Sequence, residues 1–326
     1  MEKITQVTNP KEARHLLETA LRHEWAVSFE YIVHAYSMPK MRFCYEDPVM
    51  KYRTDARAQA IQIGIDEMYH AYQLGLIITR MGGRPSFKTD EVVRYPRIID
   101  NLRRDKKTEE EVTDLYLSVT FGPGKYPELR NMILNIASDE KRHIRQFAAA
   151  VEAVEREGGA EELCFREGPD AACREDVQRL HEITRLENEI MHRYLSCAML
   201  FSDHQDLTFR LFKNSLNHMR HWDKNAGLLV EFGSVIQIEN ASTDATGREV
   251  SVHPMPVVYP GESRLSALQQ LVGEEQKIIA AYEELIVRLP AGGVKDRLAF
   301  QLAVKREHLY TQESLLANAQ GVDGLR

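Results

Sequence analysis

The chain has 326 residues, of which 43% are hydrophobic and 28% are charged, and its formal net charge is −7. This length accommodates two domains of ordinary size, and the negative charge argues against nucleic acid as a partner, because phosphate binding requires a basic face. No run approaches the roughly 18 consecutive apolar residues that span a bilayer, the first residues lack an apolar secretory segment, and the four cysteines lack paired spacing. We therefore expect a cytoplasmic protein that does not associate with membranes.

The first half of the chain shows helical spacing of its apolar residues almost throughout. Asn9-Pro10 marks one helix start, Thr108 starts a shorter helix with a capping box, and glycine pairs at 82–83 and 158–159 end helices. The predicted helices cover residues 11–38, 54–81, 108–121 and 127–157. They make up a predicted domain at residues 1–159, and the stretch at 160–174, rich in Gly, Pro, Ala and charge, is the predicted linker.

The second half repeats this plan at residues 175–326. Its predicted helices cover residues 176–201, 207–232, 264–289 and 295–319. Residues 233–263 form a long crossover between the second and third of them, and a connection of this length in a compact helical domain usually carries a function. The sequence therefore predicts an all-α protein that consists of two four-helix bundles in tandem.

The strongest chemical signal is a pair of Glu-x-x-His motifs on two different predicted helices, Glu67–His70 and Glu140–His143. Residues three apart share one face of a helix, so each motif directs a carboxylate and an imidazole to the same point. Each motif interrupts an apolar stripe, where a carboxylate is costly unless it is paired or bound to a metal. The two motifs together predict a metal site inside the first bundle.

The other two helices of such a bundle should each supply one glutamate. Glu24 lies on the apolar stripe of the first helix, whereas Glu30 lies off that stripe and is predicted to be a surface charge. In the third helix the apolar spacing favours Glu109, with Glu110 and Glu111 as close alternatives.

The ligand set also predicts the kind of metal. Four carboxylates balance two divalent cations, which allows the site to lie in a dry core, and we expect Glu67 and Glu140 to bridge the two ions. Carboxylate-rich ligation with one nitrogen per ion suits iron, with manganese as the alternative, rather than zinc. The predicted metal ligands are Glu24, Glu67, His70, Glu109, Glu140 and His143.

Three segments of the first half resemble bacterioferritins and related rubrerythrin-like proteins. They are the first-helix run from Leu21 to Met38, the second-helix segment Ile65-Asp-Glu67-Met-Tyr-His70, and the fourth-helix segment Asp139-Glu140-Lys-Arg-His143. The resemblance covers about residues 11–157 and implies the ferritin-like di-iron carboxylate superfamily, whose metal site meets oxygen or peroxide. Two fused bundles depart from the single-domain subunits of storage cages. The loop Gly82-Gly-Arg-Pro85 is similar to one in the ferritin-like domain of iminophenyl-pyruvate dimer synthases, which act on amino-acid-derived substrates in pigment biosynthesis.

The second half is predicted to be a degenerate copy of the first. Glu187–Tyr194 matches Glu24–Tyr31, His218 and His221 match Glu67 and His70, Glu275–Tyr282 matches Glu109–Tyr116, and Glu307 and Tyr310 match Glu140 and His143. A neutral imidazole cannot bridge two metals as a carboxylate does, so a second dinuclear site is not expected. The half is either a scaffold or a site in which His218, His221 and a glutamate hold one metal ion.

Besides a metal-free interaction protein, the sequence leaves two functions open. We favour an oxidase or oxygenase that uses oxygen or peroxide and an electron donor to oxidise a small organic molecule, with Tyr31 and Tyr116 as candidate catalytic residues near the metals. The tandem fusion and the long crossover, which could shape a pocket, favour this reading. The alternative is a ferroxidase or peroxide-removing iron-handling protein. A homodimer is compatible with either function.

Overall fold

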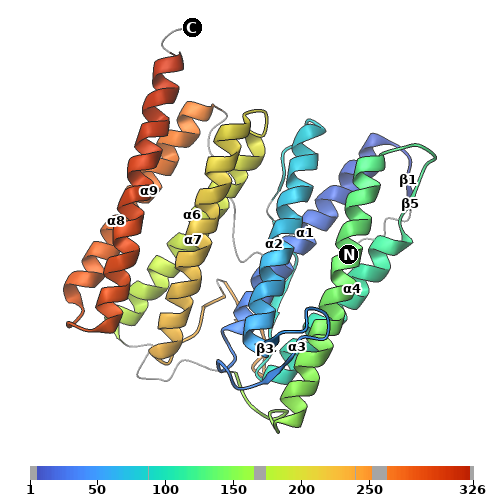
Figure 1. The fold of residues 1–326 in the computed structure, drawn as a ribbon, viewed down its shortest axis with the longest axis horizontal. Coiled ribbons are helices and arrows are strands. Elements are labelled where there is room, and N and C mark those ends of the chain that lie inside the picture. The colour runs from blue at the N-terminus through green and yellow to red at the C-terminus, as the bar shows by residue number, and fades with distance from the viewer. Residues whose placement is uncertain (1–5, 87, 165–173, 239, 252–262, 324–326) are drawn as a thin grey trace. The chain divides into compact units, whose positions relative to one another are not determined.

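The computed structural model describes residues 6–86, 88–164, 174–238, 240–251 and 263–323, and these ranges contain eight helices and seven short strands (Figure 1). The mainly helical structure confirms the predicted all-α class. The chain divides into two compact units, Met1–Phe165 with Ile238–Pro256 and Arg166–Gln237 with Val257–Arg326. In the described part of the chain, no helix is both long and apolar enough to cross a bilayer.

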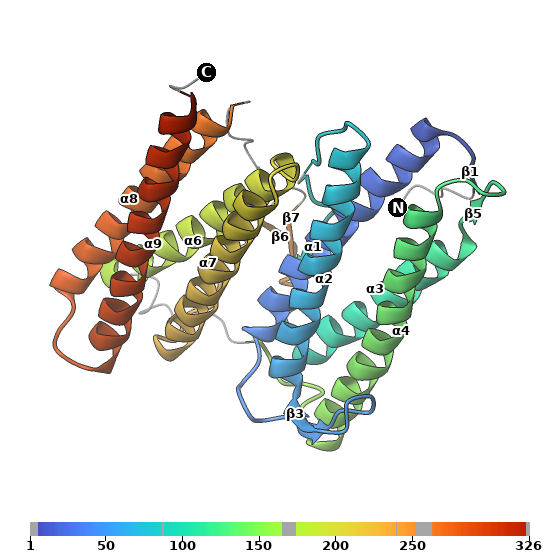
Figure 2. The same cartoon turned by 45° about the horizontal axis from the view of Figure 1, so that its top comes forward.

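Four long helices lie in the part of the first unit that the structure describes. They are α1 (Pro10–Ala35), α2 (Ala56–Arg80), α3 (Ile98–Ser118) and α4 (Pro127–Arg156). α1 packs along α2, α3 packs along α4, and α2 and α4 bring the two pairs together (Figure 2). The Asn9 side chain caps α1 by accepting from the Glu12 amide, and Asp55 caps α2 in the same way. The caps explain why these helices begin within two residues of their predicted starts.

The start of α3 differs from the prediction. The helix begins at Ile98, ten residues before the predicted capping box at Thr108, which lies inside the helix. Ile98, Ile99 and Leu102 are fully buried and extend the apolar face towards the N-terminus. Pro96 disfavours helical backbone in the residue before it, which places the boundary here rather than further upstream.

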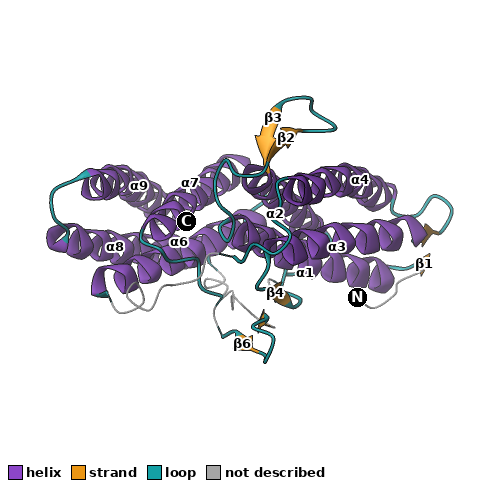
Figure 3. Ribbon diagram, turned by 90° about the horizontal axis from the view of Figure 1, so that it is seen from below, coloured by secondary structure: helices purple, strands orange, loops and turns teal. Residues whose placement is uncertain are grey.

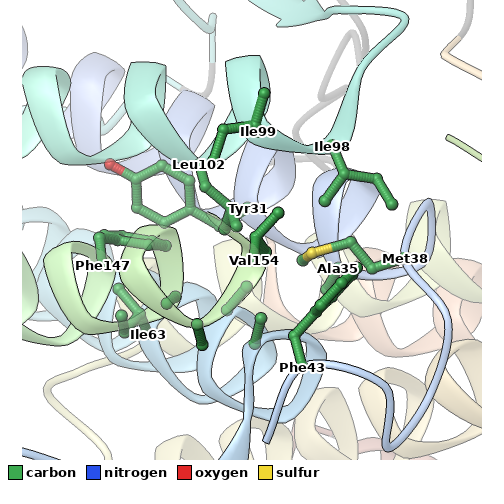
Figure 4. Close-up of a cluster of buried hydrophobic side chains, with 14 of the residues drawn as sticks. Tyr31, Ala35, Met38, Phe43, Ile63, Ile98, Ile99, Leu102, Phe147 and Val154 are labelled. Carbon is green, nitrogen blue, oxygen red and sulfur yellow. The ribbon is translucent and has the colours of Figure 1, made fainter. Parts of the chain in front are cut away.

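A hydrophobic cluster fills one end of the first unit, and Figure 4 shows its central side chains. Phe43, Ile63, Ile98 and Phe147 come from different segments and are all buried. Tyr31 belongs to this cluster and meets Phe147 edge-on, with ring centroids 5.0 Å apart. The cluster therefore fixes the Tyr31 ring in position, next to the polar residues described below.

The short strands of the described residues form small sheets outside the helices (Figure 3). β1 (Gln6–Val7) pairs with β5 (Thr120–Phe121), and β2 (Cys44–Glu46) pairs with β3 (Arg53–Asp55). β7 (Glu249–Ser251) pairs with both β4 (Val92–Arg94) and β6 (Ser242–Thr243). Arg94 Nε lies 2.5 Å from Glu249 Oε2 across the β4–β7 ladder.

This sheet changes the predicted place of the crossover. The sequence assigns residues 233–263 to the second bundle, whereas pairing with β4 groups Ile238–Pro256 with the first unit. Residues 239 and 252–262 of the crossover lie outside the described residues, as do 165–173 of the predicted linker.

The described residues of the second unit also form four helices: α6 (Glu175–Leu200), α7 (Gln205–Glu231), α8 (Arg264–Arg288) and α9 (Gly293–Asp323). α6 packs along α7 and α8 along α9, while α6 and α8 bring the pairs together. Their bounds lie within a few residues of those predicted, because each helix has the apolar face of a bundle helix.

Candidate metal centre

The six predicted metal ligands come together in the interior of the first unit. Each of its four helices contributes at least one of them, and each of the six residues is at most 4% exposed. They are Glu24 on α1, Glu67 and His70 on α2, Glu109 on α3, and Glu140 and His143 on α4. Glu110 and Glu111, the alternatives to Glu109, are exposed and pair with Lys106 and Lys107.

The six residues form two overlapping groups whose ligand atoms lie within 4.8 Å of one another. One group is Glu24, Glu67, His70 and Glu140, and the other is Glu67, Glu109, Glu140 and His143. Glu67 and Glu140 belong to both groups, while each group has its own glutamate and its own histidine. These buried groups could therefore hold metal ions at two neighbouring positions.

The imidazoles face the carboxylates through their Nδ1 atoms. His70 Nδ1 lies 2.9 Å from Glu67 Oε2 and 3.5 Å from Glu24 Oε2. His143 Nδ1 lies 2.7 Å from Glu67 Oε1 and 3.0 Å from Glu140 Oε2. Each helix thus directs one nitrogen to the side that holds the carboxylates, as the Glu-x-x-His spacing predicts.

Three residues that the sequence reasoning missed hold the outer nitrogens of the two imidazoles. His70 Nε2 lies 3.2 Å from Asp139 Oδ2, and His143 Nε2 lies 3.4 Å from Asp66 Oδ2. Arg142 Nη2 lies 3.1 Å from both aspartates. Each aspartate directly precedes a glutamate of the other motif, a signal that was visible in the sequence. A carboxylate on the outer nitrogen fixes the orientation of a ligating imidazole.

The charges of the cluster oppose one another. Burial and repulsion from Glu109 raise the pKa of Glu67 to about 7, and burial with the surrounding carboxylates raises the pKa of Glu140 well above its ordinary value. Burial alone would lower the pKa of His70 and of His143, but Glu67 raises both. The chain by itself therefore keeps the carboxylates together by holding protons, and divalent cations would take the place of these protons.

Unsatisfied oxygens show that the residues fit such cations. Glu109 Oε2 and Glu140 Oε1 are buried and have no hydrogen-bond partner in the described structure. A buried carboxylate oxygen without a partner carries a desolvation cost that a bound ion would offset. The donor set, with four carboxylates and two imidazoles, has the chemistry that hard and borderline divalent ions prefer.

The two candidate catalytic tyrosines bind the outer glutamates crosswise between helices. The Tyr31 hydroxyl on α1 donates to Glu109 Oε1 on α3 at 2.5 Å, and the Tyr116 hydroxyl on α3 donates to Glu24 on α1. Burial, with the adjacent carboxylate, raises the pKa of both phenols well above the ordinary value, so both stay protonated donors.

Glu30 is not the surface charge that the sequence predicts. It is 1% exposed, accepts from the Val93 amide at 2.7 Å, and accepts from Arg104 Nε at 2.8 Å. With His34 and Asp105 it forms a third buried group of ligand-type residues. His34 Nδ1 lies 2.8 Å from Asp105 Oδ1. The positive charge of Arg104 balances Glu30, while Asp105 Oδ2 is buried without a hydrogen-bond partner in the described residues.

The second unit places its matching residues in the same relation but fills the centre differently. Tyr194 donates to Glu275 at 2.9 Å and Tyr282 donates to Glu187 at 2.7 Å, again crosswise. His218 Nδ1 lies 2.7 Å from Glu187 Oε2, and its Nε2 lies 2.9 Å from Glu275 Oε1. In the described residues, none of the three ligand-type groups lies in this unit.

The predicted register of the last helix is wrong. Glu307 is exposed and Tyr310 is 70% exposed, whereas Lys305 is fully buried. Lys305 Nζ lies 2.6 Å from Glu187 Oε2, so Lys305 and His308 hold the positions of Glu140 and His143. These two residues are three apart and share a face, as the glutamate and histidine of the first unit do.

The neighbours of His308 support this register. His308 Nε2 lies 2.9 Å from the side chain of Asn217, which directly precedes His218. Asp66, which directly precedes Glu67, has the same relation to His143 in the first unit.

A pocket of about 940 Å³ opens between α1 and α3 of the first unit. Its lining includes Ala26 and Val27 of α1 and Val112 and Leu115 of α3. Val27 and Val112 each lie three residues, or about one helical turn, from an outer glutamate of the cluster. The pocket is large enough for a small organic molecule.

Comparison of the chain with protein-family models, with curated proteins and with solved structures finds no match in any of the three.

Proposed function

We propose that the first unit is a ferritin-like bundle that holds two metal ions, iron or else manganese, and oxidises a small organic molecule with oxygen or peroxide. The observation that carries this proposal is the pair of four-residue ligand groups that share Glu67 and Glu140. Two ligand groups with shared carboxylates match the arrangement expected for a carboxylate-bridged dinuclear centre in a four-helix bundle. The second unit is then a degenerate copy of the same bundle.

The bound metals would supply the redox chemistry with oxygen. Glu24, Glu67, His70 and Glu140 would hold one ion, and Glu67, Glu109, Glu140 and His143 would hold the other. Asp66 and Asp139 orient the two imidazoles from outside. The Tyr31 and Tyr116 hydroxyls each donate a hydrogen bond to one oxygen of an outer glutamate, which fixes the direction of its other oxygen.

The pocket between α1 and α3 favours an organic substrate over iron handling. A ferroxidase needs only a path for ions, whereas a cavity of about 940 Å³, whose lining includes Val27 and Val112 one helical turn from two of the candidate ligands, accommodates a molecule. The described part of the crossover also contacts this region, since Arg248 lies 3.2 Å from Glu91, which lines the pocket.

The first test is metal stoichiometry. Anaerobic protein is titrated with Fe(II), and we expect two ions per chain. Glu67→Ala removes a shared ligand and should abolish the two-ion stoichiometry, while Glu109→Ala should cost one ion. Glu110→Ala is the matched control, because this exposed neighbour of Glu109 should leave both ions in place. Full iron binding by Glu67→Ala would disprove the assigned site.

The second test separates the two functions. Oxygen is added to the loaded protein, and the absorption spectrum of the centre is followed. An oxidised state that persists without repeated Fe(II) turnover supports the oxidase. Rapid, repeated oxidation of added Fe(II) with mineral release supports the iron-handling alternative and contradicts the proposal.

A further inference from the structure

The pocket between α1 and α3 has two chemically distinct zones. Its buried lining, the floor, is mostly apolar, with Ala26, Val27 and Val112 beside the partly buried Leu115, and it includes His23, whose buried Nε2 has no hydrogen-bond partner in the described residues. The floor lies on the side of the candidate metal ligands, because Val27 and Val112 follow Glu24 and Glu109 by three residues on the same helices. The charged residues of the lining are more exposed than Val27 and Val112 and therefore form its rim.

The positive charges of the rim are already paired. Arg22 Nε lies 2.6 Å from Asp90, and Arg104 Nε lies 2.8 Å from the buried Glu30. Each of these guanidinium groups is therefore balanced by a carboxylate, and neither pair adds a net positive charge to the rim.

The negative charges of the rim are less balanced. Glu111 is 3.4 Å from the exposed Lys107, a weak pair in water. Asp114 forms no ion pair with any residue in the described ranges. A ligand with a positive charge would complete this part of the rim.

The opening is a feature of the first unit rather than of the shared helix plan. In the second unit, α6 and α8 take the places of α1 and α3 and bring their helix pairs into close contact. Arg179 Nη1 on α6 lies 2.6 Å from Glu284 Oε1 on α8, and Arg288 on α8 pairs with Glu175 on α6. The equivalent face of the first unit is open and acidic instead.

We propose that this pocket binds a small organic ammonium ion with an apolar body. The ammonium group lies at the rim beside Glu111 and Asp114. The apolar body lies on the floor, with its far end towards Glu24 and Glu109. The role of this ligand as the substrate rests on the proposed function, whereas its binding can be measured without metal. An inorganic cation would use the rim but would gain nothing from the apolar floor.

The test compares three probes of equal length by calorimetry, on metal-free and on iron-loaded protein. Hexylammonium should bind about tenfold more tightly than hexanoate, with 1-hexanol between them. The variant Glu111→Gln/Asp114→Asn should weaken hexylammonium about tenfold and leave 1-hexanol unchanged. Glu110→Gln is the control, since this exposed residue of the same helix does not line the pocket and should change nothing.

A second variant tests the floor. Leu115→Trp should fill the apolar zone and abolish binding of all three probes, while both metal ions still bind. Helicity from circular dichroism checks its fold, and the charge variant tests the proposal independently of this result. Preference for hexanoate, unchanged hexylammonium affinity in the charge variant, or competition of Fe(II) with hexylammonium would each overturn the proposal.

The outcomes separate this inference from the proposed function. If hexylammonium binds the metal-free protein as described but iron does not bind, the pocket assignment is supported and the metal function fails. If two irons bind and hexylammonium does not, the pocket assignment fails alone.

Discussion

In both units, two tyrosines donate crosswise to two buried glutamates: Tyr31 to Glu109 and Tyr116 to Glu24 in the first, Tyr194 to Glu275 and Tyr282 to Glu187 in the second. Two further positions, which both ligand groups of the first unit share, carry different charges in the two units. Glu67 and Glu140 of the first unit correspond to His218 and Lys305 of the second. The two units therefore share the crosswise tyrosine–glutamate hydrogen bonds, but they differ in the residues that lie between the glutamates.

The difference shows two ways to balance buried carboxylates. In the first unit four carboxylates surround two imidazoles, and the chain alone does not balance them without protons. In the second unit, burial would raise the pKa of Glu275, but His218 and Lys305 lower it to about 2. Burial would also raise the pKa of Glu187, which Lys305 and His218 hold well below its ordinary value. The ammonium of Lys305 thus supplies inside the chain the positive charge that metal ions would bring to the first unit.

Of the variants that test this comparison, replacement of Lys305 should change the free energy of unfolding most. Lys305→Met keeps the unbranched apolar stem of the side chain but leaves Glu187 buried without its cation, which should destabilise the second unit by about 3–5 kcal/mol. The chain has one tryptophan in each unit, Trp25 and Trp222, so Trp25→Phe leaves a fluorescence probe of the second unit alone. Urea unfolding followed by Trp222 measures the change.

Lys277→Met is the control, because Lys277 is exposed on α8 and its loss should cost less than about 0.5 kcal/mol. Iron stoichiometry in the first unit should stay at two per chain in both variants. A stability change of Lys305→Met no greater than that of the control would show that Lys305 does not act as the internal counter-ion.

A smaller effect concerns pH. Burial lowers the pKa of His192 on α6 to about 3, whereas the equivalent position of α1, counted from Glu24, is Phe29. The unfolded chain takes up a proton near pH 6.5 and the folded chain only near 3, so His192 lowers stability as pH falls through this window. At pH 5 the loss relative to pH 7.5 should be about 2 kcal/mol.

His192→Phe should remove this dependence. Trp222 fluorescence in the Trp25→Phe background follows unfolding at both pH values, and the quantity compared is the pH difference between the variant and its parent. Equal pH dependence in the two proteins would mean that His192 is protonated in the folded second unit.

The sequence predicted the helices and the six clustered residues because both depend on local spacing. A Glu-x-x-His motif and an apolar stripe place residues such as Glu67 and Glu24 on one helix face without knowledge of any partner. Glu109 is buried and its neighbours Glu110 and Glu111 are exposed, in agreement with the same spacing.

The predictions from the sequence were wrong where a contact with a residue far away in the chain determines which side chain is buried. Glu30 is buried because the Val93 amide and Arg104, 63 and 74 residues away, bind its two oxygens. No residue within one helical turn of Glu30 indicates that these contacts form. In α9 the expectation of a carboxylate selected Glu307, whereas a salt bridge with Glu187, 118 residues earlier, places Lys305 inside. The apolar spacing of α9 alone does not decide which of its residues face the interior, and the salt bridge with a distant residue decides it.

The smallest effect tests whether the crosswise tyrosines have the same weight in both units. Tyr194→Phe removes a donor from Glu275 Oε1, which still has His218 Nε2 at 2.9 Å, so the cost should be about 1 kcal/mol. Tyr31→Phe removes the donor to Glu109 Oε1, and a similar cost of about 1 kcal/mol is expected in the metal-free first unit. Unfolding is followed by Trp222 and Trp25 respectively, with the other tryptophan replaced by phenylalanine.

Bound iron should reduce the cost of Tyr31→Phe, because a metal ligand no longer depends on one hydrogen bond to offset its burial, whereas the cost of Tyr194→Phe should not respond to iron. Equal response of both variants to iron would mean that the second unit also binds metal, and the contrast between the two centres would then be wrong.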